Sequence, residues 1–112
     1  METIDLEKHV DVEAALSRLG GNRKLLNTLL KKFANESYLD QMKNEIADQN
    51  FDAAAKTAHL IKGVTSNLSI TGLYNHIVLL EQQLKNNSCE EGTLKDTENL
   101  YVEAVSAINR SM

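Results

Sequence analysis

The chain has 112 residues, the size of one domain, and its 12 basic and 16 acidic residues give a formal net charge of −4, which does not suggest a nucleic-acid partner. The single cysteine, Cys89, cannot form an internal disulfide, as is usual in a reducing cytoplasm. No apolar run reaches the roughly 18 residues of a membrane span, and the first residues lack the pattern of a signal peptide. These features predict a cytoplasmic protein without a membrane partner.

The beginning of the chain predicts one short helix. Residues 1–9 are polar, and we expect them to be loosely held. Asp11 is a suitable N-cap for a helix from about Val12 to Leu19. The pair Gly20-Gly21 ends this helix, because glycine tolerates the left-handed backbone at a helix C-terminus.

A longer helical pattern follows, with Asn22 as its predicted cap. The apolar residues of its first half share one face, and they are Leu26, Leu29, Leu30 and Phe33. The apolar stripe resumes with a shifted phase at Leu39, Met42 and Ile46. Two interpretations fit this shift, a break near residues 35–37 or a continuous helix over about residues 23–48. We favour the continuous helix because no glycine or proline interrupts it.

Three further helices are predicted. Asn50 is a suitable cap for a helix over about residues 51–67, and Ser69 for the next one, which ends at Asn86-Asn87. The second of these repeats apolar residues at a 3-4 spacing, namely Ile70, Leu73, Ile77, Leu80 and Leu84. Ser88 begins a capping-box pattern for a last helix that runs to about Arg110.

Four long amphipathic helices with short connections predict an all-α fold. The expected architecture is an antiparallel up-and-down four-helix bundle with a short extra N-terminal helix, forming a single domain over residues 1–112. We expect a monomer, because the apolar faces are needed for the protein's own core.

The helix over residues 51–67 carries an unusual histidine. Its core stripe contains Phe51, Ala54, Ala58, Ile61, Thr65 and Leu68. His59 lies at the border of this stripe and points largely away from it. Helical side chains lean toward the N-terminus, so a side chain at position 63 would cover the His59 ring, and Gly63 removes that cover. Glycine inside a helix costs about 1 kcal/mol relative to alanine, which argues for a function. Ala55, one turn before His59, has a small side chain that does not cover the ring, and Lys62 places a cation near the ring.

The neighbouring helix supplies a partner for this histidine. If the two helices form a hairpin that turns near residues 68–69, His59 is level with Val78, and Glu81 lies one turn further along. The Glu81 carboxylate would then accept a hydrogen bond from the His59 ring or pair with Lys62.

An exposed docking surface is also predicted around the histidine. Leu60 lies off the core stripe, so it is either covered by the short N-terminal helix or part of an exposed apolar rim. We favour the rim. Ala55, Lys56 and Ser66 would belong to the same partner-binding surface.

The pattern Ala58-His59-x-x-Lys62-Gly63, followed by Asn67-Leu68, resembles the histidine-containing phosphotransfer (HPt) domains of bacterial phosphorelays. The segment from Val12 to Phe33 is similar to the N-terminal half of these domains. Leu80-Glu81 matches the Leu-Glu pair that is usual in the helix after the histidine helix. The resemblance covers roughly residues 10–85. The family usually has a second glycine ten residues after the histidine, where this chain has Ser69.

The resemblance implies a phosphorelay intermediate in two-component signalling. His59 would accept a phosphoryl group from the aspartyl phosphate of one receiver domain and pass it to another. The implied partners are response-regulator receiver domains, as donor and acceptor, and a hybrid sensor kinase, and the receiver would supply the metal ion. No cofactor is expected, and the sequence contains neither a phosphate-binding loop for ATP nor a metal-ligand motif. The alternative is a non-catalytic helical adaptor that binds a partner protein through the apolar rim near Leu60.

Overall fold

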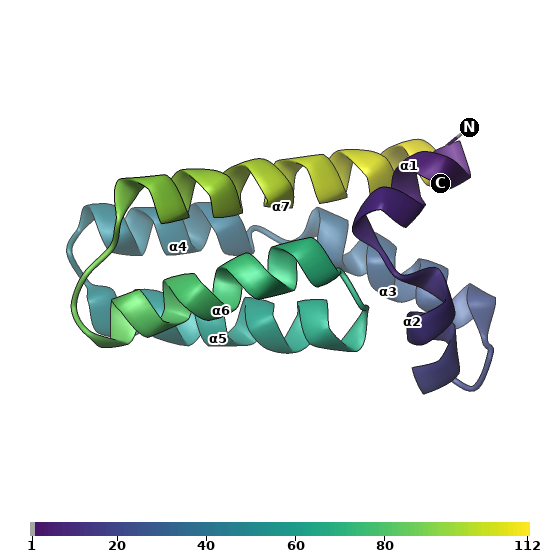
Figure 1. Cartoon of the computed structure of the whole chain (residues 1–112), viewed down its shortest axis with the longest axis horizontal. Helices are drawn as coiled ribbons and strands as arrows, with labels where there is room; N and C mark the ends of the chain where they lie inside the picture. The colour runs from purple at the N-terminus through teal and green to yellow at the C-terminus, as the bar shows by residue number, and fades with distance from the viewer. Residues whose placement is uncertain (1) are drawn as a thin grey trace.

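Every regular element of this protein is a helix (Figure 1). The computed structural model describes residues 2–112, with side chains from Leu6 onward, and Met1 lies outside the described residues. The helices are α1 Glu2–His9, α2 Val12–Arg18, α3 Arg23–Asn35, α4 Tyr38–Ala47, α5 Phe51–Asn67, α6 Thr71–Lys85 and α7 Glu91–Ser111. No strand occurs between residues 2 and 112, so the all-α prediction is confirmed for this part of the chain.

Three of the predicted N-caps are present. The side-chain oxygen of each accepts the backbone N–H three residues later: Asp11 from Ala14 at 3.1 Å, Asn22 from Leu25 at 2.9 Å and Asn50 from Ala53 at 3.3 Å. The predicted caps at Ser69 and Ser88 are wrong. Helices α6 and α7 begin after Ile70 and Glu90, and neither of these residues makes a side-chain capping bond.

Ser69 has a different role, in the turn that ends α5. Its φ of 55° is left-handed, and the Ile70 N–H donates to the Thr65 carbonyl at 2.9 Å. This is the Schellman arrangement, in which glycine is the usual left-handed residue. Ser69 is buried, its carbonyl accepts the Asp11 N–H at 2.9 Å, and its hydroxyl accepts from the Arg18 guanidinium. The serine therefore replaces the glycine and ties the α2 segment to the α5–α6 turn.

The predicted continuous helix over residues 23–48 is wrong, because α3 ends at Asn35 and α4 begins at Tyr38. Glu36, between them, has an extended backbone with φ −82° and ψ 151°. The cause is the phase shift of the apolar stripe. In one straight helix, at 100° per residue, Leu39 and Met42 would be rotated by about 190° from Leu26 and its neighbours, so the two sets would lie on opposite faces. Both sets are buried, which requires the break.

The segment predicted to be loosely held, residues 1–9, contains the helix α1, and Met1 lies outside the described residues. Leu6 and Val10 are each only 1% exposed, and α1 packs against α7 and α6. Val10 directly follows α1, and its N–H donates to the Leu6 carbonyl at 2.8 Å. The two side chains are therefore one turn apart and enter the core together.

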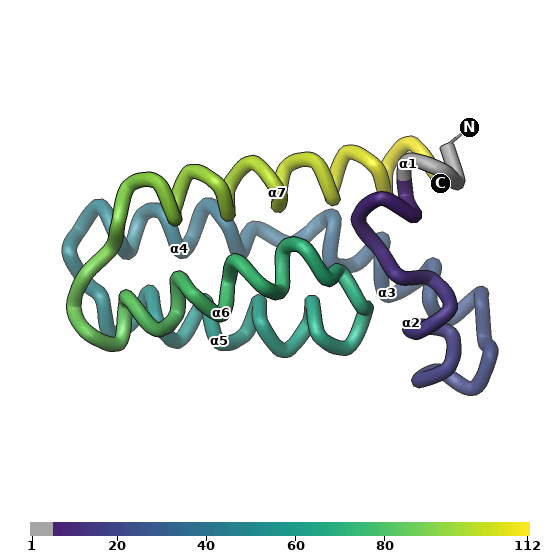
Figure 2. The backbone as a smooth tube through the Cα atoms, in the orientation of Figure 1, coloured from purple at the N-terminus to yellow at the C-terminus, as the bar shows by residue number. Residues whose placement is uncertain are grey.

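The long helices pack side by side over a shared core. Helix α5 contacts α6 and α4, and α7 contacts α6, α3 and α1. The largest fully buried side chains are Leu6, Leu26, Leu30, Phe33, Met42, Ile61, Leu68, Ile70, Leu73, Ile77, Leu80 and Leu84. The tube in Figure 2 shows α2 and the first turns of α3 extending beyond the α5–α6 turn along the long axis. The outer face of α5 is left uncovered, and the candidate site lies on it.

Candidate functional site

His59 lies on the outer face of α5, as predicted. Its neighbours Ala58 and Ile61 are fully buried, and they orient the helix. The His59 side chain is 69% exposed. A large partner can therefore reach the imidazole without any rearrangement of the core.

Glu81 on α6 lies at the centre of a cluster of donors. Its side chain is only 3% exposed. Oε1 accepts from the Lys62 ammonium at 2.7 Å. Oε2 accepts from the Lys85 ammonium at 3.3 Å and contacts His59 Nδ1 at 3.0 Å. The predicted contacts of Glu81 with His59 and with Lys62 are therefore both present.

The charge state of Glu81 determines the tautomer of His59. Burial acts to raise the pKa of Glu81, but hydrogen bonds from Lys62, Lys85 and His59 and the Lys62 charge outweigh it, and the pKa is lowered below the usual 4.5. An ionised carboxylate can only accept hydrogen bonds, so His59 Nδ1 carries the proton of this contact. In the neutral ring the lone pair is then on Nε2, at the other side of the imidazole.

A Glu81→Gln variant is expected to have a free energy of unfolding lower by about 1–3 kcal/mol near pH 7, because two ammonium groups lose their buried counter-charge. The folded-state pKa of Glu81 lies below its unfolded value. The stabilisation is therefore complete above the unfolded value and is lost as the pH falls through the folded one. Urea denaturation at a series of pH values from about 7 downward should show that the difference between wild type and variant shrinks as the pH falls.

The matched control for this measurement is Glu98→Gln. Glu98 also pairs with a lysine, Lys43, but its side chain is 31% exposed, so its loss should change the unfolding free energy by less than about 1 kcal/mol. A Glu81→Gln variant as stable as the wild type near pH 7 would contradict the role of the carboxylate as a buried counter-charge.

Lys85 is a member of the cluster that sequence reasoning missed. A signal was available, because a glutamate followed by a lysine four residues later favours pairing on a helix face. The hairpin register places Glu81 near His59 but does not show which way the Lys85 side chain reaches. Its side chain is 61% exposed and reaches back to the carboxylate.

Gly63 is exposed, and a Cβ added there would meet no atom within 4 Å. An alanine would therefore fit beside His59, and only a longer side chain can cover the ring. Leu60 is 45% exposed, so the prediction of an exposed apolar residue at this position is confirmed. Lys56 and Ser66 are exposed as well.

Ala55 corrects the predicted docking surface. Only 8% of its surface is exposed, and it belongs to the buried core cluster. Its small side chain is thus packed inside the protein and does not lie on the outer face of α5. Ala55 therefore contributes to the core and adds almost nothing to a surface that a partner could contact.

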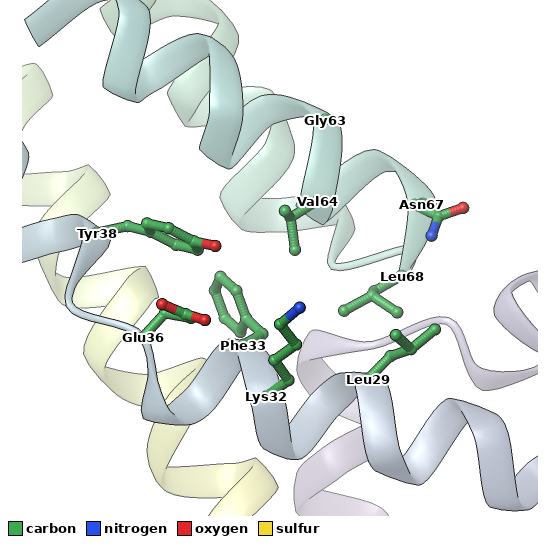
Figure 3. A pocket seen from close by; sticks show the side chains of 9 residues that line it. All are labelled: Leu29, Lys32, Phe33, Glu36, Tyr38, Gly63, Val64, Asn67 and Leu68. Atoms are coloured by element: carbon green, nitrogen blue, oxygen red, sulfur yellow. The ribbon is translucent and has the colours of Figure 1, made fainter.

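A cavity of about 370 Å³ opens beside Gly63. Figure 3 shows Val64 of α5 and Leu68, directly after this helix, facing Leu29 and Phe33 of α3 across it. The side chains of Lys32, Glu36, Tyr38 and Asn67 complete the lining. The cavity is thus a recess between α3 and α5, and Val64, one turn after Leu60, is part of its lining.

Comparisons of the chain with protein-family models, curated protein sequences and solved structures find no match. Among the described residues, no group of three histidine, cysteine or carboxylate side chains is placed to hold a metal ion. None of the helices that the structure describes combines the length and apolar character needed to cross a bilayer. The function is therefore argued from the geometry around His59.

Proposed function

We propose that this chain is a histidine-containing phosphotransfer protein that carries a phosphoryl group on His59 between receiver domains. The observation that carries the proposal is the contact between His59 Nδ1 and the ionised Glu81 at 3.0 Å. It leaves the Nε2 lone pair on a side chain that is 69% exposed. A neutral, oriented and accessible imidazole is what a phosphoryl acceptor requires.

In the proposed reaction, His59 Nε2 attacks the phosphorus of an aspartyl phosphate. The N–P bond forms, the P–O bond breaks, and its electron pair returns to the aspartate of the receiver. The ring becomes cationic, and the Glu81 carboxylate stabilises this charge through the Nδ1–H. The reverse sequence, on a second receiver, regenerates the neutral ring.

Two neighbours support the transfer in this proposal. Lys62, three residues after His59, pairs with Glu81 at 2.7 Å and lies close enough to attract the oxygens of an incoming phosphoryl group. Gly63 leaves open space beside the ring, so that a folded receiver can approach. Lys56, Leu60 and Ser66 would contact the receiver around the site.

The proposal includes the bundle architecture expected for this family. Helices α3 and α4 together would form the first of four antiparallel helices, followed by α5, α6 and α7, with α1 and α2 covering one end. The packing of α5 against α4 and α6, and of α7 against α6 and α3, supports this arrangement.

The proposal is tested by mixing the protein with receiver domains that carry aspartyl phosphate. We expect one phosphoryl group per chain, detected by intact mass and by a phosphate-affinity gel. The modification should be lost in acid and stable in base, as a phosphoramidate is, and it should disappear when an unphosphorylated receiver is added. ATP alone should give no labelling.

The rival proposal is the helical adaptor, which the exposure of Leu60 favours. It predicts binding to a partner without covalent change of the protein. If no receiver from a broad panel transfers phosphate to the wild type, the phosphotransfer proposal fails.

A further inference from the structure

Glu81 Oε2 is shared by two donors, whereas Oε1 has one. The His59 Nδ1–H lies 3.0 Å from Oε2, and the Lys85 ammonium lies 3.3 Å from the same atom. Lys62 binds Oε1 at 2.7 Å. His59 and Lys85 therefore share one acceptor oxygen, which places an ammonium next to the Nδ1 contact. The proposed transfer step does not require this ammonium.

An unshared carboxylate would bind His59 more strongly and would favour the protonated imidazolium. A protonated ring has no free lone pair and cannot attack phosphorus. An ammonium at the same oxygen has two opposing effects. It takes part of the acceptor's charge, and its own positive charge repels a proton on the ring.

We infer that Lys85 is a positioning residue that limits the hold of Glu81 on His59, so that the ring stays oriented but remains free to act as a nucleophile. This inference rests on the proposed phosphotransfer function. It assigns separate tasks to the two lysines of the cluster. In the proposed reaction Lys62 attracts the phosphoryl oxygens, whereas Lys85 weakens the attraction between the Glu81 carboxylate and the His59 ring.

The other charged groups near His59 leave this task to Lys85. On α5, Lys56 pairs with Asp52 at 3.4 Å, one turn before the ring. From α4, Glu45 binds the Thr57 hydroxyl at 2.6 Å, on the side of α5 that faces α4. From α6, Glu81 and Lys85 are the charged side chains that contact the cluster, and Lys85 alone shares the oxygen bound by Nδ1.

The test is a titration of the His59 ring by NMR in wild type and a Lys85→Met variant. Lys85 Nζ lies 3.3 Å from the oxygen that contacts Nδ1. Removing this unit charge should move the midpoint upward by about half a pH unit in a water-like dielectric. Lys85→Arg keeps the charge and should restore the wild-type midpoint. Lys24→Met removes the same charge from the start of α3, outside the cluster, and should leave the midpoint unchanged.

Phosphoryl acceptance gives the second readout. The rate for Lys85→Met should fall about threefold well below the midpoint and equal the wild-type rate well above it, because only the neutral fraction changes. A merely structural role would lower the rate at every pH. Lys85 is exposed near the end of α6, so the variant should fold, and circular dichroism checks this.

The outcomes separate this inference from the proposed function. An unmoved or lowered midpoint in folded Lys85→Met overturns the role of Lys85, even if the wild type accepts phosphate normally. If the midpoint rises but no receiver phosphorylates the wild type, the proposed function fails, and the influence of Lys85 on the ring stands.

Discussion

Replacing His59 with glutamine is expected to abolish phosphoryl acceptance while the helical structure stays intact. Glutamine has no nucleophilic nitrogen, so no N–P bond can form. The His59 side chain is 69% exposed and outside the core, so the unfolding free energy should change by less than about 1 kcal/mol. Labelling from a phosphorylated receiver and urea denaturation, measured on the same preparation, check both statements.

The other two histidines provide the controls for this variant. His76 is bound through Nδ1 to the Gly72 carbonyl at 2.9 Å on α6, and His9 ends α1. Neither lies beside a buried carboxylate, so His9→Gln and His76→Gln should label like the wild type. A His59→Gln protein that still carries an acid-labile phosphoryl group would place the acceptor elsewhere and remove the basis of the proposed function.

Replacing Gly63 with glutamine is expected to slow phosphoryl transfer about 100-fold, the size of effect that a small displacement of the reacting groups can cause. The glutamine side chain would lean toward the N-terminus and occupy the space beside His59. The fold should be retained or slightly stabilised, since glutamine is the better helix former by up to about 1 kcal/mol. Single-turnover transfer from a phosphorylated receiver measures the effect.

Two variants locate this effect in the side chain beyond Cβ. Gly63→Ala should transfer within a few-fold of the wild type, because a Cβ at this position meets nothing within 4 Å. Gly92→Gln makes the same substitution in the first turn of α7, where a Cβ also finds open space, and it should transfer normally. Equal rates for Gly63→Gln and the wild type would show that the glycine does not provide access.

Local patterns predicted the helices around the site well. The helices predicted over about residues 51–67 and from Ile70 to just before Asn86 correspond to Phe51–Asn67 and Thr71–Lys85. An asparagine cap and a regular apolar spacing act within a few residues, so a single sequence shows them. The break before Tyr38 depends on two apolar faces that are buried on opposite sides, and the absence of glycine and proline was the wrong guide to it.

The part of the site that the sequence could predict is the part that follows from the register of the α5–α6 hairpin. Counting from the turn placed Glu81 near His59, and the two are in contact. The burial of Ala55 depends on how the other helices pack around α5, which no local pattern states. The sharing of Glu81 Oε2 by His59 and Lys85 follows from side-chain positions that only the packed helices define.

All members of the cluster around His59 come from one helical hairpin, α5 and α6. His59 and Glu81 are 22 residues apart in the chain, so their meeting closes a short loop, which carries a small entropy loss and forms rapidly. The contacts of α7 with α1 and α3 join segments that are far more distant in sequence. The proposed phosphoryl acceptor is thus held by two helices that are adjacent in the chain, and its contacts can form without the association of the chain ends.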